Sequence, residues 1–311
     1  MGAIGVLGTG GFVPAPVVDN TIIGRWSGAG EDWIVQRTGV RSRRYAPPDQ
    51  PTSALAARAA APLLADSRHR EALRMIMLAT STPDRPQPAT ASAVQAELGL
   101  SGVAACDLNA VCCGFLYGLV LTAALLGQQG GTGLVIGADR YSSIMDRSDR
   151  RTVSLFGDGA GAVLLGPVPD GYGIRGSSLA AHGELRELVR VPEERRLFEM
   201  QGRAVKEYAL DLIPKVAAEA LAASGMALDD IDRFVFHQGN VRMVEACAEA
   251  MGVDMDRVPL TAPDLGNTAA ASIPLTLHHA AVDRPFRRGE QVLLAGVGGG
   301  MTAGAVVLTW H

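Results

Sequence analysis

The stretches Gly157-Asp-Gly-Ala-Gly-Ala-Val-Leu-Leu165 and Gly300-Met-Thr-Ala-Gly-Ala-Val-Val-Leu308 are nearly alike and begin 143 residues apart. An apolar run that leads into a polar loop also occurs twice, at 75–81 and at 234–240. These two echoes predict a duplicated α/β unit of about 150 residues, with one half at 1–166 and the other at 167–311. The alternative is chance, because 37 glycines and many alanines make such matches common.

The order of the apolar runs indicates the fold class. Short runs of strand character alternate with longer runs of helical periodicity, which is the pattern of α/β proteins. The expected strands cover 4–7, 75–79, 104–108, 133–137, 162–165, 234–236, 292–295 and 305–308. The expected helices cover 52–64, 90–98, 114–126, 205–223, 241–251 and 272–282, with Pro274 in the first turn of the last one.

Composition excludes several classes of protein. A chain of 311 residues with 48% hydrophobic residues can bury a large core and is not mainly disordered. Lys+Arg 28 against Asp+Glu 32 gives a net charge of −4, so no basic surface for nucleic acid is expected. Four cysteines are too few for a disulfide framework and match no zinc spacing, which fits a reducing cytoplasm.

One apolar stretch imitates a membrane span. Residues 110–127 carry no charge and approach the length of a transmembrane helix. They lie between Asp107 and Asp139 without a flanking Lys or Arg, so a buried helix is the better interpretation and no membrane partner is expected. The first sixteen residues lack a secretory-signal pattern, and we expect a cytoplasmic chain that begins near Met1.

Two glycine-rich stretches match nucleotide-binding loops in the spacing of their first glycines but not in the elements that follow them. Residues 8–13 run into Pro14 and Pro16, which prevent a helix from following. Residues 298–303 precede a strand, so no helix N-terminus would meet a pyrophosphate. The six histidines show no paired metal-ligand spacing. We therefore expect neither a nucleotide cofactor nor a metal site.

Cys112 is a candidate nucleophile. It lies where the expected strand 104–108 gives way to the buried helix that begins near Gly114. The partial positive charge of a helix start favours a thiolate, which predicts a lowered pKa. The alternative is a small apolar residue in a core, the commonest fate of a free cysteine.

His237 and Asn267 occupy comparable places in the second half. His237 follows the expected strand 234–236, and Asn267 stands in a turn before the helix 272–282, where α/β proteins carry reactive groups. Each has a plainer interpretation, a hydrogen-bonded surface histidine and a helix-capping asparagine. Together with Cys112 they suggest a Cys–His–Asn site. Papain-like proteases share this order, but the expected sequence around their cysteine is absent here.

Five motifs carry a resemblance to a known family: 107–115 (DLNAVCCGF), 156–162 (FGDGAGA), 237–242 (HQGNVR), 266–274 (GNTAAASIP) and 298–300 (GGG). In order and spacing they resemble β-ketoacyl-acyl-carrier-protein synthase III of the thiolase superfamily, over essentially the whole chain. The resemblance implies a thiolase-type duplicated αβαβα layered fold and a homodimer.

The resemblance also implies a reaction. Cys112 would take an acyl group from acyl-CoA, and decarboxylation of malonyl-acyl carrier protein would give a carbanion that attacks the acyl-cysteine. His237 and Asn267 would stabilise the enolate, and the backbone N–H groups of Cys112 and Gly299 would form the oxyanion hole. No metal or redox cofactor would take part, since CoA and phosphopantetheine thioesters are the substrates.

Substrate-binding positions follow from the same motifs. Trp33 and Arg150 match a pair that sandwiches the CoA adenine, and Arg37 and Arg242 match positive positions at the entrance. Arg242 would also contact an acidic acyl carrier protein. The further implied positions are Met200, Gly202, Lys206, Asn240 and Gln87.

Several residues depart from the family pattern. Cys113 replaces an alanine, Gln87 stands where an aromatic residue caps the acyl pocket across the dimer, and Lys206 stands where Phe lines the channel. These changes predict a starter-unit enzyme of specialised metabolism with a larger or more polar acyl group. The alternatives are an acyltransferase that passes the acyl group to an alcohol, amine or carrier without decarboxylation, and an inactive scaffold.

Overall fold

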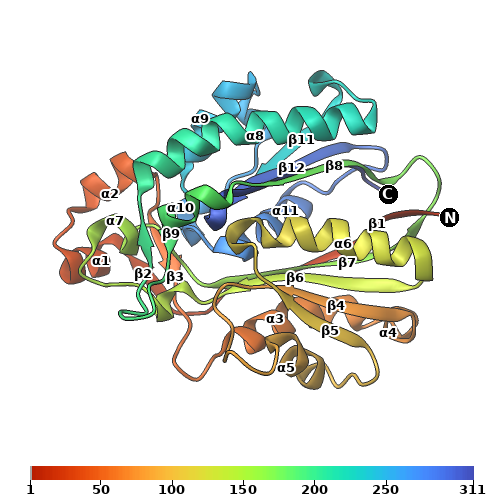
Figure 1. Ribbon diagram of the computed structural model, residues 1–311, viewed down its shortest axis with the longest axis horizontal. Helices are drawn as coiled ribbons and strands as arrows, with labels where there is room; N and C mark the ends of the chain where they lie inside the picture. Colours follow the sequence, from red (N-terminus) through yellow and green to blue (C-terminus); the bar gives the residue numbers. More distant parts are fainter. Residues whose placement is uncertain (1) are drawn as a thin grey trace.

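The computed structural model describes residues 2–311 and contains two stacked sheets with helices between and outside them (Figure 1). The first sheet has the order β1-β7-β6-β4-β5, and the second has the order β11-β12-β13-β8. The strands of the first are β1 (Ala3–Phe12), β4 (Leu73–Ala79), β5 (Ala104–Leu108), β6 (Thr132–Asp139) and β7 (Gly159–Val168). The strands of the second are β8 (Gly173–Ala181), β11 (Arg233–Phe236), β12 (Gln291–Gly298) and β13 (Thr302–Thr309).

The two sheets repeat one pairing pattern. In the first, β1 and β7 are antiparallel, β7 and β6 are antiparallel, and β6 and β4 are parallel. In the second, β8 with β13, β13 with β12, and β12 with β11 repeat this succession. The echo at 157–165 and 300–308 falls on β7 and β13, which take equivalent places. This repetition is what the predicted duplication requires, and the division at residue 166 stays a prediction.

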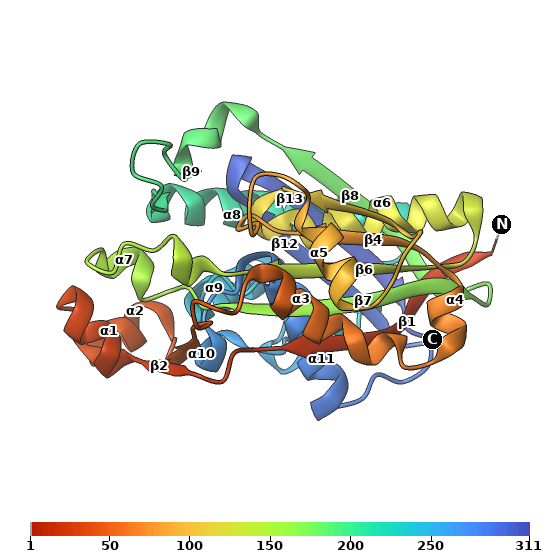
Figure 2. The same cartoon turned by 90° about the horizontal axis from the view of Figure 1, so that it is seen from below.

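Helices complete five layers, which are stacked from top to bottom in Figure 1, while Figure 2 looks along the direction of stacking. Helices α3 (Thr52–Ala60) and α5 (Thr90–Glu97) cover the outer face of the first sheet. Helices α8 (Gly202–Ser224) and α9 (Val241–Met251) lie on the outer side of the second sheet. Helices α6 (Gly114–Gln129) and α11 (Ser272–Asp283) lie between the two sheets. The predicted thiolase-type αβαβα fold is confirmed.

Helix α6 is the apolar stretch that imitated a membrane span. The run Val111–Gln129 is long and apolar enough to cross a membrane, and half of this stretch is buried inside the molecule. Phe115, Leu116 and Leu119 pack into one cluster with residues of both sheets, including Val135 and Leu294. The expected buried helix is therefore confirmed, because a helix between two sheets needs apolar residues around most of its circumference.

The expected strands and main helices all form, and several elements were not expected. Strand β8 contains Gly176, Ser177 and Ser178, which have weak strand propensity, and it pairs with β13. The short helices α1, α2 and α7 and the antiparallel strand pair β2 and β3, whose bounds follow, pack beside one another. The additional elements are β2 (Val17–Asp19), α1 (Asn20–Ser27), α2 (Glu31–Thr38), β3 (Ser42–Arg44), α4 (Ser67–Glu71), α7 (Arg150–Val153), β9 (Val189–Arg190), β10 (Glu199–Met200) and α10 (Ala262–Leu265).

A buried arginine connects several of these short elements. Arg43 of β3 is fully buried and donates to the Asn20 side chain (2.8 Å) and to the Ser154 carbonyl (2.6 Å) just after α7. Burial lowers the pKa of Arg43 to about 10, so the guanidinium stays charged at neutral pH. Its hydrogen bonds join the β2–β3 strand pair, α1 and the end of α7 beside the cavity described next.

Candidate active site

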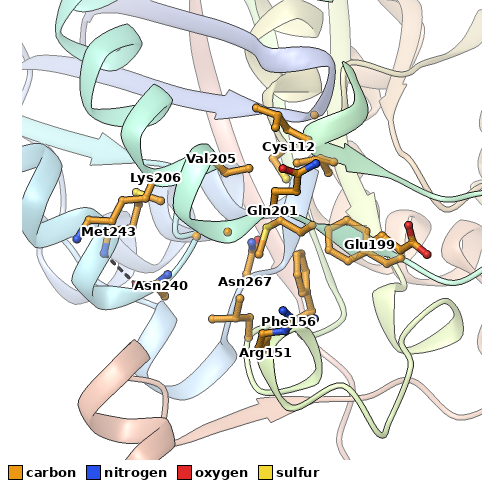
Figure 3. A pocket seen from close by; sticks show the side chains of 18 of the residues that line it. Cys112, Arg151, Phe156, Glu199, Gln201, Val205, Lys206, Asn240, Met243 and Asn267 are labelled. Atoms are coloured by element: carbon orange, nitrogen blue, oxygen red, sulfur yellow. Dashed lines mark hydrogen bonds between the residues drawn. The ribbon is translucent and has the colours of Figure 1, made fainter. Parts of the chain in front are cut away.

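One cavity of about 1420 Å³ collects nearly all of the candidate residues, and both halves line it (Figure 3). Cys112 comes from the first half, and His237, Asn267 and Gly299 come from the second. Figure 3 shows Cys112 and Asn267 with Gln201 between them. The other expected residues in the lining are Trp33, Arg37, Arg150, Met200, Gly202, Lys206, Asn240 and Arg242. Gln87 is exposed and does not line this cavity.

Cys112 lies in a tight turn, residues 109–113, here called the Cys112 turn. The Val111 N–H donates to Asn109 Oδ1 (3.1 Å), and Val111 has φ 49, in the left-handed region. The helical run from Val111 to the end of α6 begins here, so the Cys112 N–H belongs to a first turn that lacks intrahelical acceptors. This strained backbone places the thiol at the cavity wall, where 9% of the residue is exposed.

The pKa of the Cys112 thiol is raised, chiefly by burial and then by the negative charge of Asp139. The sequence-based expectation of a lowered pKa is therefore wrong. A helix start supplies only a fraction of a charge, and it does not compensate the loss of water around a buried thiolate. The thiol is protonated in the resting protein.

Asn267 lies in a turn of the same design, residues 267–271, here called the Asn267 turn. The Ala269 N–H donates to Asn267 Oδ1 (2.9 Å), and Ala269 also has φ 49. Because the side-chain oxygen is occupied, the amide NH₂ is the group left to act as a donor. The backbone of Asn267 is held on both sides, since its N–H donates to Leu155 and its carbonyl accepts from Gly157.

His237 follows β11 directly, and its N–H donates to the Ala295 carbonyl of β12 (2.8 Å). The residue is 8% exposed, and burial lowers its pKa to about 4. Within residues 2–311, Nδ1 has no hydrogen-bond partner. Gly296 lets β12 approach, because a Cβ there would lie 2.9 Å from the His237 Cβ. The imidazole is neutral at pH 7 and can offer one N–H.

Three aromatic side chains, which the sequence did not single out, form a wall beside Cys112. Tyr141 and Phe156 stack with ring centroids 4.5 Å apart, and Phe198 meets both rings edge-on at 5.4 and 4.9 Å. All three are buried in one cluster with Cys112. The Tyr141 hydroxyl lies 3.1 Å from Ser81 Oγ, which fixes the ring. Phe156 stood inside a quoted motif, whereas Tyr141 and Phe198 had no recognisable pattern.

Cationic side chains surround the entrance. The Arg150 guanidinium lies 5.1 Å from the centre of the Trp33 ring, so the expected pair is in contact. Arg37, Arg150 and Lys206 form no ion pair within the described residues. Arg242 instead pairs with Glu245 (2.9 Å) and donates to the Gln36 carbonyl. It is thus already engaged within its own chain.

Asn240 is a structural cap as well as a cavity residue. Its Oδ1 accepts from the Met243 N–H (2.9 Å), the dashed line in Figure 3, and begins α9. Lys206 points toward the same region from α8. Asn240 lies four residues after the end of β11, so its cap places the start of α9 beside the cavity.

The layered fold and a cavity that joins a thiol, an imidazole and a primary amide define a condensing acyltransferase of the thiolase superfamily. Residues 106–183 match the family model of 3-oxoacyl-[acyl-carrier-protein (ACP)] synthase III, and residues 221–310 match the model of its C-terminal part. The chain belongs to this family, whose members include the FabH enzymes.

Relatives extend over the whole chain. The chain is 42% identical to "Acetoacetyl CoA synthase NphT7" of Streptomyces sp. (strain CL190), covering 98% of both chains. It is 41% identical to the β-ketoacyl-[acyl-carrier-protein] synthase III of Laribacter hongkongensis, covering 97% of this chain and 98% of the relative. The crystal structure of FabH from Pseudomonas aeruginosa PAO1 superposes with a TM-score of 0.93 at 36% identity, covering 99% and 98% of the two chains.

Proposed function

We propose that the chain loads an acyl group from acyl-CoA onto Cys112 and condenses it, with loss of CO₂, with a malonyl group carried by acyl carrier protein. The observation that supports this is the convergence of Cys112, His237 and Asn267 from opposite halves on one cavity. No step in this scheme requires a metal or a redox cofactor.

Acyl loading takes place at Cys112. The Cys112 sulfur forms a bond to the thioester carbon, and the bond from that carbon to the CoA sulfur breaks. The thiol proton leaves with CoA, because the resting thiol is protonated. The backbone N–H groups of Cys112 and Gly299 donate to the tetrahedral oxyanion, where one such donor contributes about 3 kcal/mol to barrier lowering.

Condensation takes place between His237, Asn267 and the acylated Cys112. His237 and Asn267 donate to the malonyl thioester oxygen, where negative charge develops as CO₂ leaves and the electron pair forms an enolate. Two neutral donors suit this step, because a protonated imidazole is disfavoured by burial. The enolate carbon then attacks the acyl carbon, and the Cys112 sulfur leaves as a thiolate that takes up one proton from water, which gives the 3-oxoacyl thioester and restores the thiol.

The starter acyl group is short in this proposal. Tyr141, Phe156 and Phe198 pack closely beside the thiol, which limits the acyl chain that Cys112 can carry. The Streptomyces relative is named an acetoacetyl-CoA synthase, and acetoacetyl is itself a short acyl group. The sequence-based expectation of a larger or more polar acyl group stays the competing prediction. Lys206 lines the cavity on the other side, on α8 toward Asn240, and contacts the thioester carrier rather than the acyl chain.

Intact-mass measurement tests the proposal. Wild-type protein and Cys112→Ala are exposed to acetyl-, butyryl- and octanoyl-CoA, and the loaded protein is chased with malonyl-acyl carrier protein or malonyl-CoA. We expect an acetyl adduct that is absent in the variant, and CO₂ with a 3-oxoacyl thioester after the chase. An adduct that persists until an alcohol or amine is supplied would replace condensation by plain acyl transfer. Preferential octanoyl loading would overturn the short-chain proposal.

A homodimer is part of the proposed function. Strand β5 is the edge of the first sheet, and its outer side has no partner strand within residues 2–311. A second copy can extend the sheet there, which would bring its residue Gln87 toward the neighbouring cavity. A cytoplasmic location is also part of the proposal, and the use of CoA and carrier thioesters as substrates supports it. Sedimentation at twice 32.4 kDa is the expected result, and a monomer would contradict it.

A further inference from the structure

Asp139 ends β6 at the boundary between the two halves and is fully buried. Its Oδ1 accepts from both hydroxyl and backbone groups of the segment Thr80 to Thr82, at 2.8 to 3.1 Å. Its Oδ2 accepts from the Ala270 N–H at 2.9 Å. One carboxylate thus connects the loop after β4 with the Asn267 turn of the other half.

These contacts need a group that only accepts hydrogen bonds. Within the described residues, Asp139 forms no ion pair, and every neighbour that contacts its oxygens is a donor. An ionised carboxylate offers acceptor sites on both oxygens, whereas an amide offers them on one and places a donor at the other. The contacts therefore require the carboxylate itself and not merely a side chain of its size.

The bond to Ala270 acts on Asn267 through two residues. Ala270 follows Ala269, whose N–H holds Asn267 Oδ1 (2.9 Å). Ala269 has φ 49, a conformation that persists only when neighbouring contacts impose it. The turn is held at its start by the bond from Asn267 to Leu155 and near its end by the bond from Ala270 to Asp139. The direction of the Asn267 amide NH₂ depends on both.

We propose that Asp139 is a positioning residue for the condensation step, holding the Asn267 turn so that the Asn267 amide meets the enolate oxygen. The inference rests on the function proposed above. Acyl loading does not need this bond, because the Cys112 turn has its own contacts. There Val111 is held by Asn109 (3.1 Å), and the Ala110 carbonyl accepts from Thr302 Oγ1 (3.0 Å).

The substitution Asp139→Asn tests this positioning role. The new amide has one oxygen and one NH₂ group. In either orientation its NH₂ group faces a backbone N–H, at Ala270 or in the loop after β4. Two partial reactions are measured separately, acyl-cysteine formation by quenched intact mass and CO₂ release from the malonyl thioester. We expect acyl loading to keep at least a third of the wild-type rate, because D139N also removes the negative charge that raises the pKa of the Cys112 thiol, and CO₂ release to be at least tenfold slower. Asn267→Ala is expected to show the same split, and combining it with D139N adds no further tenfold loss.

A matched control and a second readout complete the test. Thr80→Val removes one of several donors to Oδ1 and is expected to leave both reactions within threefold of wild type. Hydrogen exchange of peptides covering 266–271 is expected to accelerate in D139N, while 109–113 keeps its wild-type rate. If D139N does not fold, Asp139→Ser, which retains an acceptor oxygen, takes its place.

Two outcomes overturn the proposal. Equal loss of loading and CO₂ release would mean that Asp139 only supports the fold, and unchanged CO₂ release would mean that it does not position Asn267. If wild-type protein releases no CO₂ at all, the proposed function fails. The exchange measurement still reports on the Asn267 turn in that case, so the two failures are distinguishable.

Discussion

Burial decides the charge of His237, and this has a measurable effect on stability. The pKa of His237 is about 4 in the folded protein and about 6.5 in the unfolded chain. The unfolded state therefore binds the proton first as the pH falls, and stability is lost between pH 6.5 and 4. The expected loss from this residue at pH 5 is about 2 kcal/mol relative to pH 7.

Urea unfolding at pH 7 and pH 5 checks this expectation. His237→Asn lacks the titration, so the variant should lose about 2 kcal/mol less than wild type over this interval. The comparison also removes the contribution of other titrating groups, such as Asp158, whose pKa burial raises to about 6. Equal pH dependence of the two proteins would show that the imidazole is not desolvated.

Trp33 offers a second prediction at the residue scale. Its ring lies in the cavity lining with the Arg150 guanidinium 5.1 Å away, and the proposed role of this pair is to stack on the adenine of CoA. Trp33→Ala should raise KM for acyl-CoA about tenfold and leave kcat nearly unchanged, because stacking far from the reacting atoms contributes uniform binding. Trp26 does not line the cavity, so Trp26→Ala is the control and should leave KM unchanged. A fall in kcat for the Trp33 variant would contradict this assignment.

At the scale of elements, close contact between β6 and the Asn267 turn requires a glycine. A Cβ at Gly137 would lie 2.1 Å from the Ala270 carbonyl oxygen. Gly137→Ala should therefore displace the turn and slow CO₂ release by more than tenfold. Gly127 in α6 has open space around the Cβ position, so Gly127→Ala should instead stabilise the protein by about 0.5–1 kcal/mol. Activity and thermal unfolding of both variants provide the measurement.

Most regular elements could be predicted from sequence because their apolar periodicity reflects burial. The strand at 104–108 and the helix at 241–251 were expected with the bounds that the structure shows. Strand β8 was not predicted, because its glycines and serines have weak strand propensity and form a strand here through pairing with β13. The motifs located Cys112, His237 and Asn267, whereas the aromatic wall depends on tertiary packing between Tyr141 and Phe198. The raised pKa of Cys112 also depends on enclosure, which no local pattern records.

At the scale of the whole molecule, the two halves share one core. Phe115 is fully buried in a cluster that contains residues of both sheets. Separating the two halves would therefore expose apolar side chains of each. Phe115→Ala should cost about 3–5 kcal/mol and lower the stability of both halves together. Leu121 of the same helix is 49% exposed, and Leu121→Ala should cost little.

Denaturant unfolding followed at two places checks this shared core. Trp26 and Trp33 report on the first half, and Trp310 reports on the second, in variants that retain tryptophan in one half only. We expect coincident transitions in wild type and in the Phe115 variant. Two separated transitions would mean that the halves are independent domains.

The Cys112 turn and the Asn267 turn have the same construction, and this resemblance has a historical meaning. In each, an asparagine oxygen accepts the N–H two residues later, that residue has φ 49, and a helix between the sheets follows. An ancestral half that paired with its own copy would have presented two identical turns across a twofold axis. Once both copies were joined in one gene, they could specialise. One turn carries a thiol at position 112, while its counterpart has alanine at 270 and turns its asparagine toward the substrate. Specialisation of two copies of one symmetric turn would account for the division of labour between Cys112 and Asn267 in this site.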